Sequence, residues 1–119
     1  MNYKNKIGNF GQQLAGHFFQ KRQYKILEQN YQQRSGEIDL ILEKDGQIVF
    51  AEVKTRLSEN FGLPEEAIDS AKKEKIYQTG LQYLAEKGIE HDNFRIDCLA
   101  IVIDKAKKRA IIRHHKNIR

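Results

Sequence analysis

Two alternating segments joined by Asp45-Gly46 constrain the fold of this chain more than any other feature. An Asp-Gly pair between such segments predicts a two-residue hairpin turn, in which Lys44 lies opposite Gln47. The register fixed by this turn places six apolar side chains on one face of the hairpin: Ile38, Leu40, Leu42, Val49, Ala51 and Val53. A slip of one residue would turn that whole set to the other face, so the pattern predicts a single register with one buried face.

The other face of this hairpin is apolar at one end, where Ile41 meets Phe50, and charged at the other end. The same register places Asp39 opposite Glu52, and Glu37 opposite Lys54. Directly opposed side chains have Cβ atoms about 4.5–5.5 Å apart, and like charges at that distance destabilise a sheet. The sequence therefore demands an explanation for two acids at this position.

A divalent cation would remove the repulsion between Asp39 and Glu52, because Mg²⁺ is held by one or two carboxylates together with water and phosphate oxygens. Lys54 projects on the same side, where an ammonium could stabilise a phosphate or orient a nucleophilic water. This arrangement suits metal-assisted hydrolysis of phosphodiesters. The alternative is a plain cross-strand salt bridge between Glu37 and Lys54, with Asp39 and Glu52 in water. The spacing alone leaves both interpretations open.

The rest of the chain predicts two helices and three further strands around this hairpin. Phe10, Leu14 and Phe18 form one helical stripe, and Pro64 and Gly88 mark the start and end of a second helix. The predicted elements are a helix at 9–22, strands at 24–32, 37–44 and 47–55, a helix at 63–88, and strands at 94–104 and 109–118. The expected fold is one α/β domain over residues 1–119, a mixed five-stranded sheet flanked by helices in the order αβββαββ.

Positive charge is concentrated at one end of the sequence. The last fifteen residues contain seven basic and no acidic side chains, which exceeds the net charge of +5 for the whole chain. The basic residues that we expect to contact nucleic acid are those of this end and two lysines of the second helix: Lys72, Lys75, Lys105, Lys107, Lys108, Arg109 and Arg113. A patch that binds phosphates and a merely solvated basic end both fit this distribution.

Composition limits the cellular setting. The single Cys98 excludes an internal disulfide, no apolar run is long enough to cross a membrane, and the first residues lack the apolar region of a signal peptide. We expect a cytoplasmic protein with no membrane partner, for which a homodimer is one possible assembly. Cys98 is expected to be buried. The adjacent His114 and His115 should point to opposite faces of a strand, extending the basic surface or lying at a frayed end.

The residues of the hairpin also resemble a known signature. Asp39 followed, after twelve intervening residues, by Glu52-Val53-Lys54 is similar to the PD-(D/E)xK nuclease pattern. The strings GEIDLI at 36–41 and FAEVKTR at 50–56 are more specific, and five positions follow them in order: Phe61, Gly62, Pro64, Glu66 and Ala67. Together these resemble the YraN family of endonuclease-like proteins, whose relatives include archaeal Holliday-junction resolvases. The resemblance covers nearly the whole chain, from the first helix through 94–104.

This resemblance implies a restriction-endonuclease-like core in which Asp39 and Glu52 bind Mg²⁺ or Mn²⁺ and Lys54 completes the catalytic site. Glu37 matches the GEID string of the family, with a less defined role. Many relatives carry an acidic residue in a Gly-Glu pair of the first helix, where this chain has Gly11-Gln12. An amide offers a metal one neutral oxygen and no charge, so Gln12 weakens the expected site.

The function expected from these residues is a Mg²⁺-dependent DNA endonuclease that hydrolyses phosphodiester bonds, with branched DNA suggested by the relatives alone. Two alternatives remain open. One is a DNA-binding module that keeps the nuclease fold with weak or no catalysis. The other is a protein-interaction domain whose basic end meets an acidic partner.

Overall fold

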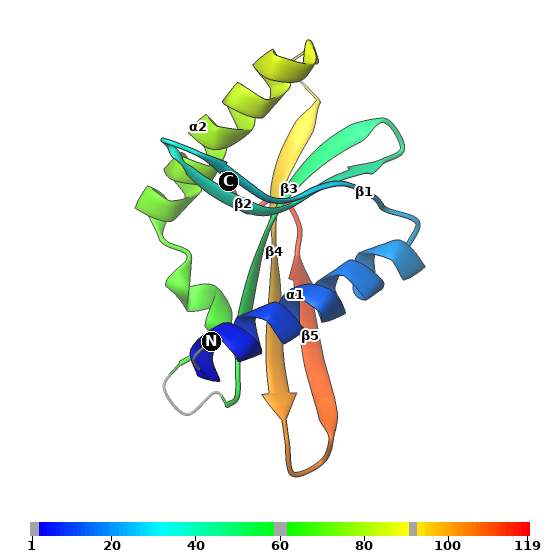
Figure 1. The fold of residues 1–119 in the computed structure, drawn as a ribbon, viewed down its shortest axis with the longest axis vertical. Helices are drawn as coiled ribbons and strands as arrows, with labels where there is room; N and C mark the ends of the chain where they lie inside the picture. Colours follow the sequence, from blue (N-terminus) through cyan, green and yellow to red (C-terminus); the bar gives the residue numbers. More distant parts are fainter. Residues whose placement is uncertain (1–2, 59–61, 91–92) are drawn as a thin grey trace.

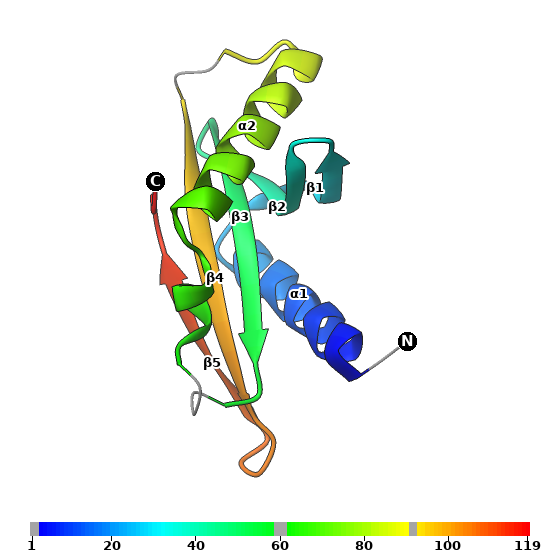
Figure 2. The same ribbon diagram turned by 90° about the vertical axis from the view of Figure 1, so that its left-hand side faces the viewer.

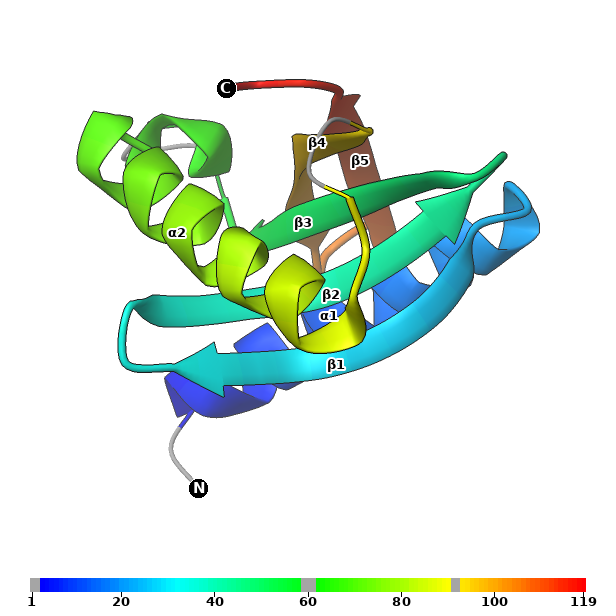
Figure 3. The same cartoon turned by 90° about the horizontal axis from the view of Figure 1, so that it is seen from above.

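A computed structural model describes residues 3–58, 62–90 and 93–119 of the chain (Figure 1). Its helices and strands are α1 (Tyr3–Lys21), β1 (Lys25–Gln33), β2 (Gly36–Lys44), β3 (Gln47–Arg56), the 3₁₀ helix η1 (Pro64–Ala67), α2 (Ser70–Lys87), β4 (Phe94–Asp104) and β5 (Arg109–His115). The strands form one sheet in the order β1-β2-β3-β4-β5. Helices α1 and α2 cover opposite faces of that sheet (Figures 2 and 3).

The sheet is mixed because one of its connections crosses over. Strands β1, β2 and β3 form an antiparallel meander, and β4 and β5 are also antiparallel. Strands β3 and β4 are parallel, and α2 lies in the crossover that a parallel pair requires. The predicted order αβββαββ is therefore confirmed, and the arrangement is consistent with a restriction-endonuclease-like core.

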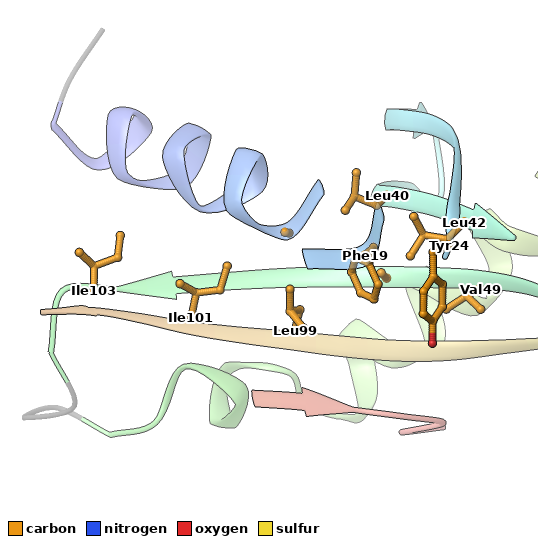
Figure 4. Close-up of a cluster of buried hydrophobic side chains, with 10 residues drawn as sticks. Phe19, Tyr24, Leu40, Leu42, Val49, Leu99, Ile101 and Ile103 are labelled. Carbon is orange, nitrogen blue, oxygen red and sulfur yellow. The ribbon is translucent and has the colours of Figure 1, made fainter. Parts of the chain in front are cut away.

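Each face of the sheet has its own hydrophobic core. The core under α1 contains Ala15, Phe19, Tyr24, Leu40, Leu42, Val49, Ala51, Leu99, Ile101 and Ile103 (Figure 4). The core under α2 contains Ile38, Ile41, Ile48, Phe50, Ile76, Tyr83, Leu84 and Ile96. Strands β3 and β4 lie in the middle of the sheet and supply apolar side chains to both cores. Because both of their faces are covered, a polar side chain on either strand tends to be buried.

The predicted hairpin register is confirmed near the turn. Asp45 and Gly46 both have positive φ, 51° and 80°, as the favoured two-residue hairpin turn requires. The paired residues run from Lys44–Gln47 through Leu42–Val49 and Ile41–Phe50 to Leu40–Ala51.

Beyond Leu40 the predicted pairing of β2 with β3 is wrong. The register pairs of β2 with β3 stop at Leu40–Ala51, and the backbone N–H of Val53 donates to Asp39 Oδ2 at 2.8 Å. A side-chain carboxylate thus takes the hydrogen bond that a backbone carbonyl would take in a regular ladder. The alternation of β2 also breaks here, because Ile38 lies in the core under α2 and not with Leu40 under α1.

The second helix begins later than predicted. Pro64 opens η1, a separate 3₁₀ turn, and α2 starts only at Ser70, after Asp69 has capped it by accepting the N–H of Lys72 at 2.9 Å. Gly88 ends α2, as predicted, and adopts the left-handed conformation there. Among the described residues, neither helix has the length and apolar character needed to span a bilayer.

Candidate active site

Asp39 and Glu52 meet at the point where β2 separates from β3. Glu52 lies in the middle of β3 with 4% of its surface exposed, and Asp39 is partly buried beside it. One oxygen of Asp39 accepts the N–H of Val53, the residue after Glu52, which holds the two carboxyl groups close together. The predicted proximity of these acids is therefore present, although it arises from this side-chain hydrogen bond and not from a register pair.

The environment of Glu52 opposes its negative charge. Burial, then the charge of Asp39, raise the pKa of Glu52 to about 7, and a hydrogen bond with Asp39 adds to the effect. The pKa of Asp39 is also raised above its ordinary value, mainly by burial. The hydrogen bond from Val53 opposes this increase, and the charge of Glu37 adds to it. Near neutral pH this pair is therefore poised to share or lose a proton.

Two lysines face the pair without forming hydrogen bonds to it. Lys54 on β3 and Lys72 in the first turn of α2 each place Nζ 3.7 Å from Glu52 Oε1. This separation exceeds a charge-assisted hydrogen bond of about 2.7–2.9 Å. Both lysine side chains are about one-third exposed, at 33% and 36%, so solvent screens their attraction for the buried acids.

Helix α1 approaches β3 very closely on the other side of the sheet. A Cβ on Gly11 would lie 1.8 Å from Thr55 Oγ1, so only glycine fits at this crossing. The next residue, Gln12, donates from Nε2 to the backbone oxygen of Asp39 at 3.4 Å. The Gly11-Gln12 pair therefore lies in the first helix, as predicted, and Gln12 presents an amide nitrogen to β2.

The other predicted site residues lie at varying distances from this pair. Glu37 is exposed on β2 and faces Gln32 of β1 in the register. Lys75 is exposed beside Gly36, at the start of β2. Four cations cluster at the β4–β5 hairpin: Lys105, Lys107, Lys108 and Arg109. Since Glu52 pairs with Cys98, this hairpin lies about 20 Å further along β4.

Arg113 is engaged with an acid that the sequence did not indicate. Its guanidinium donates to Glu65 of η1 through Nε at 2.8 Å and a terminal nitrogen at 3.0 Å. His115 Nε2 lies 2.7 Å from Glu65 Oε2. The hydrogen bond from Arg113 is the main reason that the pKa of Glu65 falls to about 2. This cluster anchors η1 to β5.

Cys98 separates this Glu65 cluster from the carboxylate pair. Glu52 pairs with Cys98 across β3 and β4, and Cys98 pairs with His115 across β4 and β5. Burial raises the pKa of the Cys98 thiol to about 12, and the charges of Glu65 and Glu52 add to the increase. Cys98 is buried as predicted, and its thiol is kept protonated between two acidic groups.

His114 has a structural role that the sequence did not indicate. Its Nε2 lies 2.8 Å from Oδ2 of Asp97, which is fully buried on β4, and its ring packs against Phe18, Phe19 and Tyr24. The expectation of an exposed or frayed His114 is therefore wrong. The pairing of β5 with β4 brings it beneath α1, while His115 points to the other face as predicted.

The fold and this site define an α/β protein with a mixed five-stranded sheet, consistent with a restriction-endonuclease-like core, in which a buried and a partly buried carboxylate lie beside two lysines. The chain belongs to the uncharacterised protein family UPF0102, whose sequence profile matches residues 11–101.

Relatives from this family align with most of the chain. A UPF0102 protein of Alkaliphilus metalliredigens is 37% identical over 102 residues, which cover 86% of this chain and 90% of the relative. One from Sulfurihydrogenibium sp. is 42% identical over 98 residues, covering 82% and 85% of the two chains. One from Clostridium botulinum is 39% identical over 119 residues, covering 98% and 97%.

Proposed function

We propose that this protein is a divalent-metal-dependent nuclease that hydrolyses phosphodiester bonds of DNA at the Asp39–Glu52 pair. One observation carries the proposal: the buried carboxyl group of Glu52 meets the partly buried one of Asp39 on the neighbouring strand, while the lysines beside them stay at 3.7 Å from Glu52. Natural folds rarely retain such an arrangement for stability alone, since isolated buried charges are costly. The similarity to the PD-(D/E)xK pattern agrees with this assignment.

The residues present suit a small hard cation. Mg²⁺ needs one or two carboxylates and otherwise keeps water or substrate oxygens, which Asp39 and Glu52 would satisfy. Within the described ranges no cluster of three or more Asp, Glu, His or Cys side chains is placed to hold a metal, so the site would be a two-carboxylate one. A bound ion would supply positive charge to the phosphate and a more acidic water.

The two lysines have separate tasks in this proposal. Lys54 projects from the same strand as Glu52, where its ammonium can orient the attacking water or stabilise charge on the phosphate. Lys72 lies in the first turn of α2, where it can contact the phosphate of the bound strand. Contacts of this kind recognise charge and not bases, so we expect strong salt dependence and little sequence preference.

The direct test is cleavage of end-labelled duplex and four-way-junction DNA in the presence of Mg²⁺ or Mn²⁺. We expect cleavage by the wild-type protein and none by Asp39→Ala or Lys54→Ala. Glu74→Gln removes an exposed carboxylate on α2 that bonds only Gln78 in the described structure, and this control should cleave normally. Absence of cleavage by the wild-type protein at every concentration of either metal would contradict the enzymatic proposal.

Gln12 favours a second candidate function, a DNA-binding module with weak or no catalysis. Its amide nitrogen is committed to the Asp39 backbone at 3.4 Å, so it adds no negative ligand to the pair. This alternative predicts retention of DNA at low salt without turnover. Cleavage that appears only in Gln12→Glu would support this alternative over the leading proposal, whereas wild-type cleavage as fast as that of Gln12→Glu would exclude it.

A further inference from the structure

A hollow of about 510 Å³ lies between α1 and the β4–β5 hairpin, away from the carboxylate pair. Its lining residues belong to α1 and to the β4–β5 hairpin, whereas Lys72, which faces Glu52, belongs to α2. These two helices cover opposite faces of the sheet (Figure 2). We call this hollow the α1 groove. Its volume falls in the range of about 300–1,000 Å³ that is typical of ligand sites.

The floor of the α1 groove is apolar. Ile7, Phe10 and Leu14 are spaced to lie on one side of α1, and Ile103 points from β4 toward the side of the sheet that α1 covers (Figure 4). Ile7 and Leu14 pack partly on the core, but Phe10 has 49% of its surface exposed. The groove thus presents an aromatic ring that the fold itself does not cover.

The rim of the α1 groove is basic. Four cations surround it: Lys6, Lys105, Lys108 and Arg109. Asp104 is the one acid among the described lining residues, and its Oδ1 already accepts the backbone N–H of Lys107 at 3.1 Å. An occupant with apolar and negatively charged groups would therefore complement the groove.

We propose that the α1 groove binds an acidic peptide segment of a partner protein, anchored by one aromatic or large aliphatic side chain. The apolar floor would bury the anchor beside Phe10, and the cations of the rim would attract the carboxylates on either side. The site is independent of the proposed nuclease activity, because none of the carboxylate pair or its two lysines lines it.

The floor distinguishes a peptide from a nucleic-acid backbone as the occupant. Phosphates would contact the rim cations but leave the half-exposed ring of Phe10 uncovered. Within the hairpin, Lys107 is exposed but does not line the groove, whereas Lys105 and Lys108 do. Binding of a DNA backbone depends on charge alone, so Lys107 and Lys108 should contribute to it similarly. Binding of a peptide seated in the groove should depend on Lys108 and not on Lys107.

The proposal is tested by panning a displayed library of random twelve-residue peptides on the full chain, with counter-selection on Phe10→Ala. We expect enriched peptides to combine at least two acidic residues with one aromatic or large aliphatic residue. Binding of the best synthetic peptide, measured by fluorescence anisotropy, should weaken at least tenfold in Phe10→Ala and severalfold in Lys108→Ala. It should change less than twofold in Lys107→Ala, and Asp39→Ala should bind as the wild type does.

Several results would overturn this proposal. One is a failure to enrich any peptide over the Phe10→Ala protein, and another is enrichment of peptides without acidic residues. Displacement of the peptide by a 20-base-pair duplex, with equal losses in Lys107→Ala and Lys108→Ala, would assign the surface to nucleic acid. Phe10-dependent binding to phosphatidylserine vesicles without peptide binding would assign it to a membrane. A dimer that dissociates in Phe10→Ala would assign it to a second copy of the chain.

Discussion

Glu52 and Asp97 are both buried acids on the neighbouring central strands β3 and β4, yet their surroundings are opposite. Asp97 accepts hydrogen bonds from Arg95 Nε at 3.0 and 3.2 Å and from the N–H of Asn117 at 2.9 Å, with His114 Nε2 at 2.8 Å. Burial alone would raise the pKa of Asp97, but these hydrogen bonds outweigh it and lower the pKa. Glu52 instead has two ammonium groups at 3.7 Å and a raised pKa.

This difference separates a structural acid from a candidate functional one. The partners of Asp97 come from β4, β5 and the segment after β5, so its charge fixes the chain end to the sheet. The charge of Glu52 is left incompletely neutralised and open to a further cation. Breaking the first arrangement should destabilise the protein, whereas neutralising the second should stabilise it.

The largest effect is expected for Asp97→Ala. This substitution removes a fully buried acid and leaves the guanidinium of Arg95 and the N–H of Asn117 without that acceptor, which should lower the free energy of unfolding by about 3–5 kcal/mol. Urea denaturation at pH 7 measures this change. A loss below about 1 kcal/mol would show that Asp97 does not hold the sheet and chain end together.

Glu52→Gln should act in the opposite direction. The folded pKa of Glu52, about 7, lies above its ordinary value of 4.5, so the folded state binds the extra proton and wild-type stability falls as pH rises from about 4.5 to 7. The amide avoids this loss, and the variant should be roughly 3 kcal/mol more stable than the wild type at pH 8 and similar to it at pH 4. Urea denaturation at both values measures the effect. Equal stability at pH 8 would contradict the raised pKa.

Added Mg²⁺ should stabilise the wild-type protein through the same pair. At pH 8 and 10 mM Mg²⁺ we expect a gain of about 1.4 kcal/mol if the dissociation constant is about 1 mM. The gain should vanish in Glu52→Gln and should shrink at pH 6, because protonated Glu52 no longer attracts the ion. Thermal unfolding with and without the metal follows this effect, and an equal gain in both proteins would place the ion elsewhere.

The smallest effect is expected for Lys72→Met. Lys72 lowers the pKa of Glu52 from a distance of 3.7 Å while its side chain is 36% exposed, so its removal should raise that pKa slightly and cost at most about 1 kcal/mol at pH 8. The losses of unfolding free energy in Lys72→Met and in Asp97→Ala can then be compared directly. A loss as large as that of Asp97→Ala would mean that Glu52 is a satisfied structural acid.

The sequence was most informative where the structure is set by local rules. The positive φ values of Asp45 and Gly46 follow from the turn, and the turn sets the register as far as Leu40–Ala51. The break at Asp39 could not be predicted from the sequence. A carboxylate that replaces a backbone acceptor does not change the alternation of apolar and polar residues along the strand. The sequence did identify Asp39 and Glu52 as neighbours.

The contacts that the sequence missed join residues far apart in the chain. Asp97 and His114 are separated by 17 positions, and Glu65 and His115 by 50, so neither pair is visible until β5 is placed beside β4. The late start of α2 has a local cause that the sequence contains. Asp69 is a good N-cap, and it competes with Pro64 as the residue that marks the start of the helix.

A ¹³C NMR titration of the Glu52 carboxyl group, without metal and in 10 mM Mg²⁺, tests the proposed cation site most directly. We predict a midpoint near pH 7 without metal and a clearly lower midpoint when Mg²⁺ is present, because the bound ion favours the carboxylate. A midpoint near the ordinary value of 4.5 that does not respond to Mg²⁺ would contradict the claim that Asp39 and Glu52 form a site for a cation.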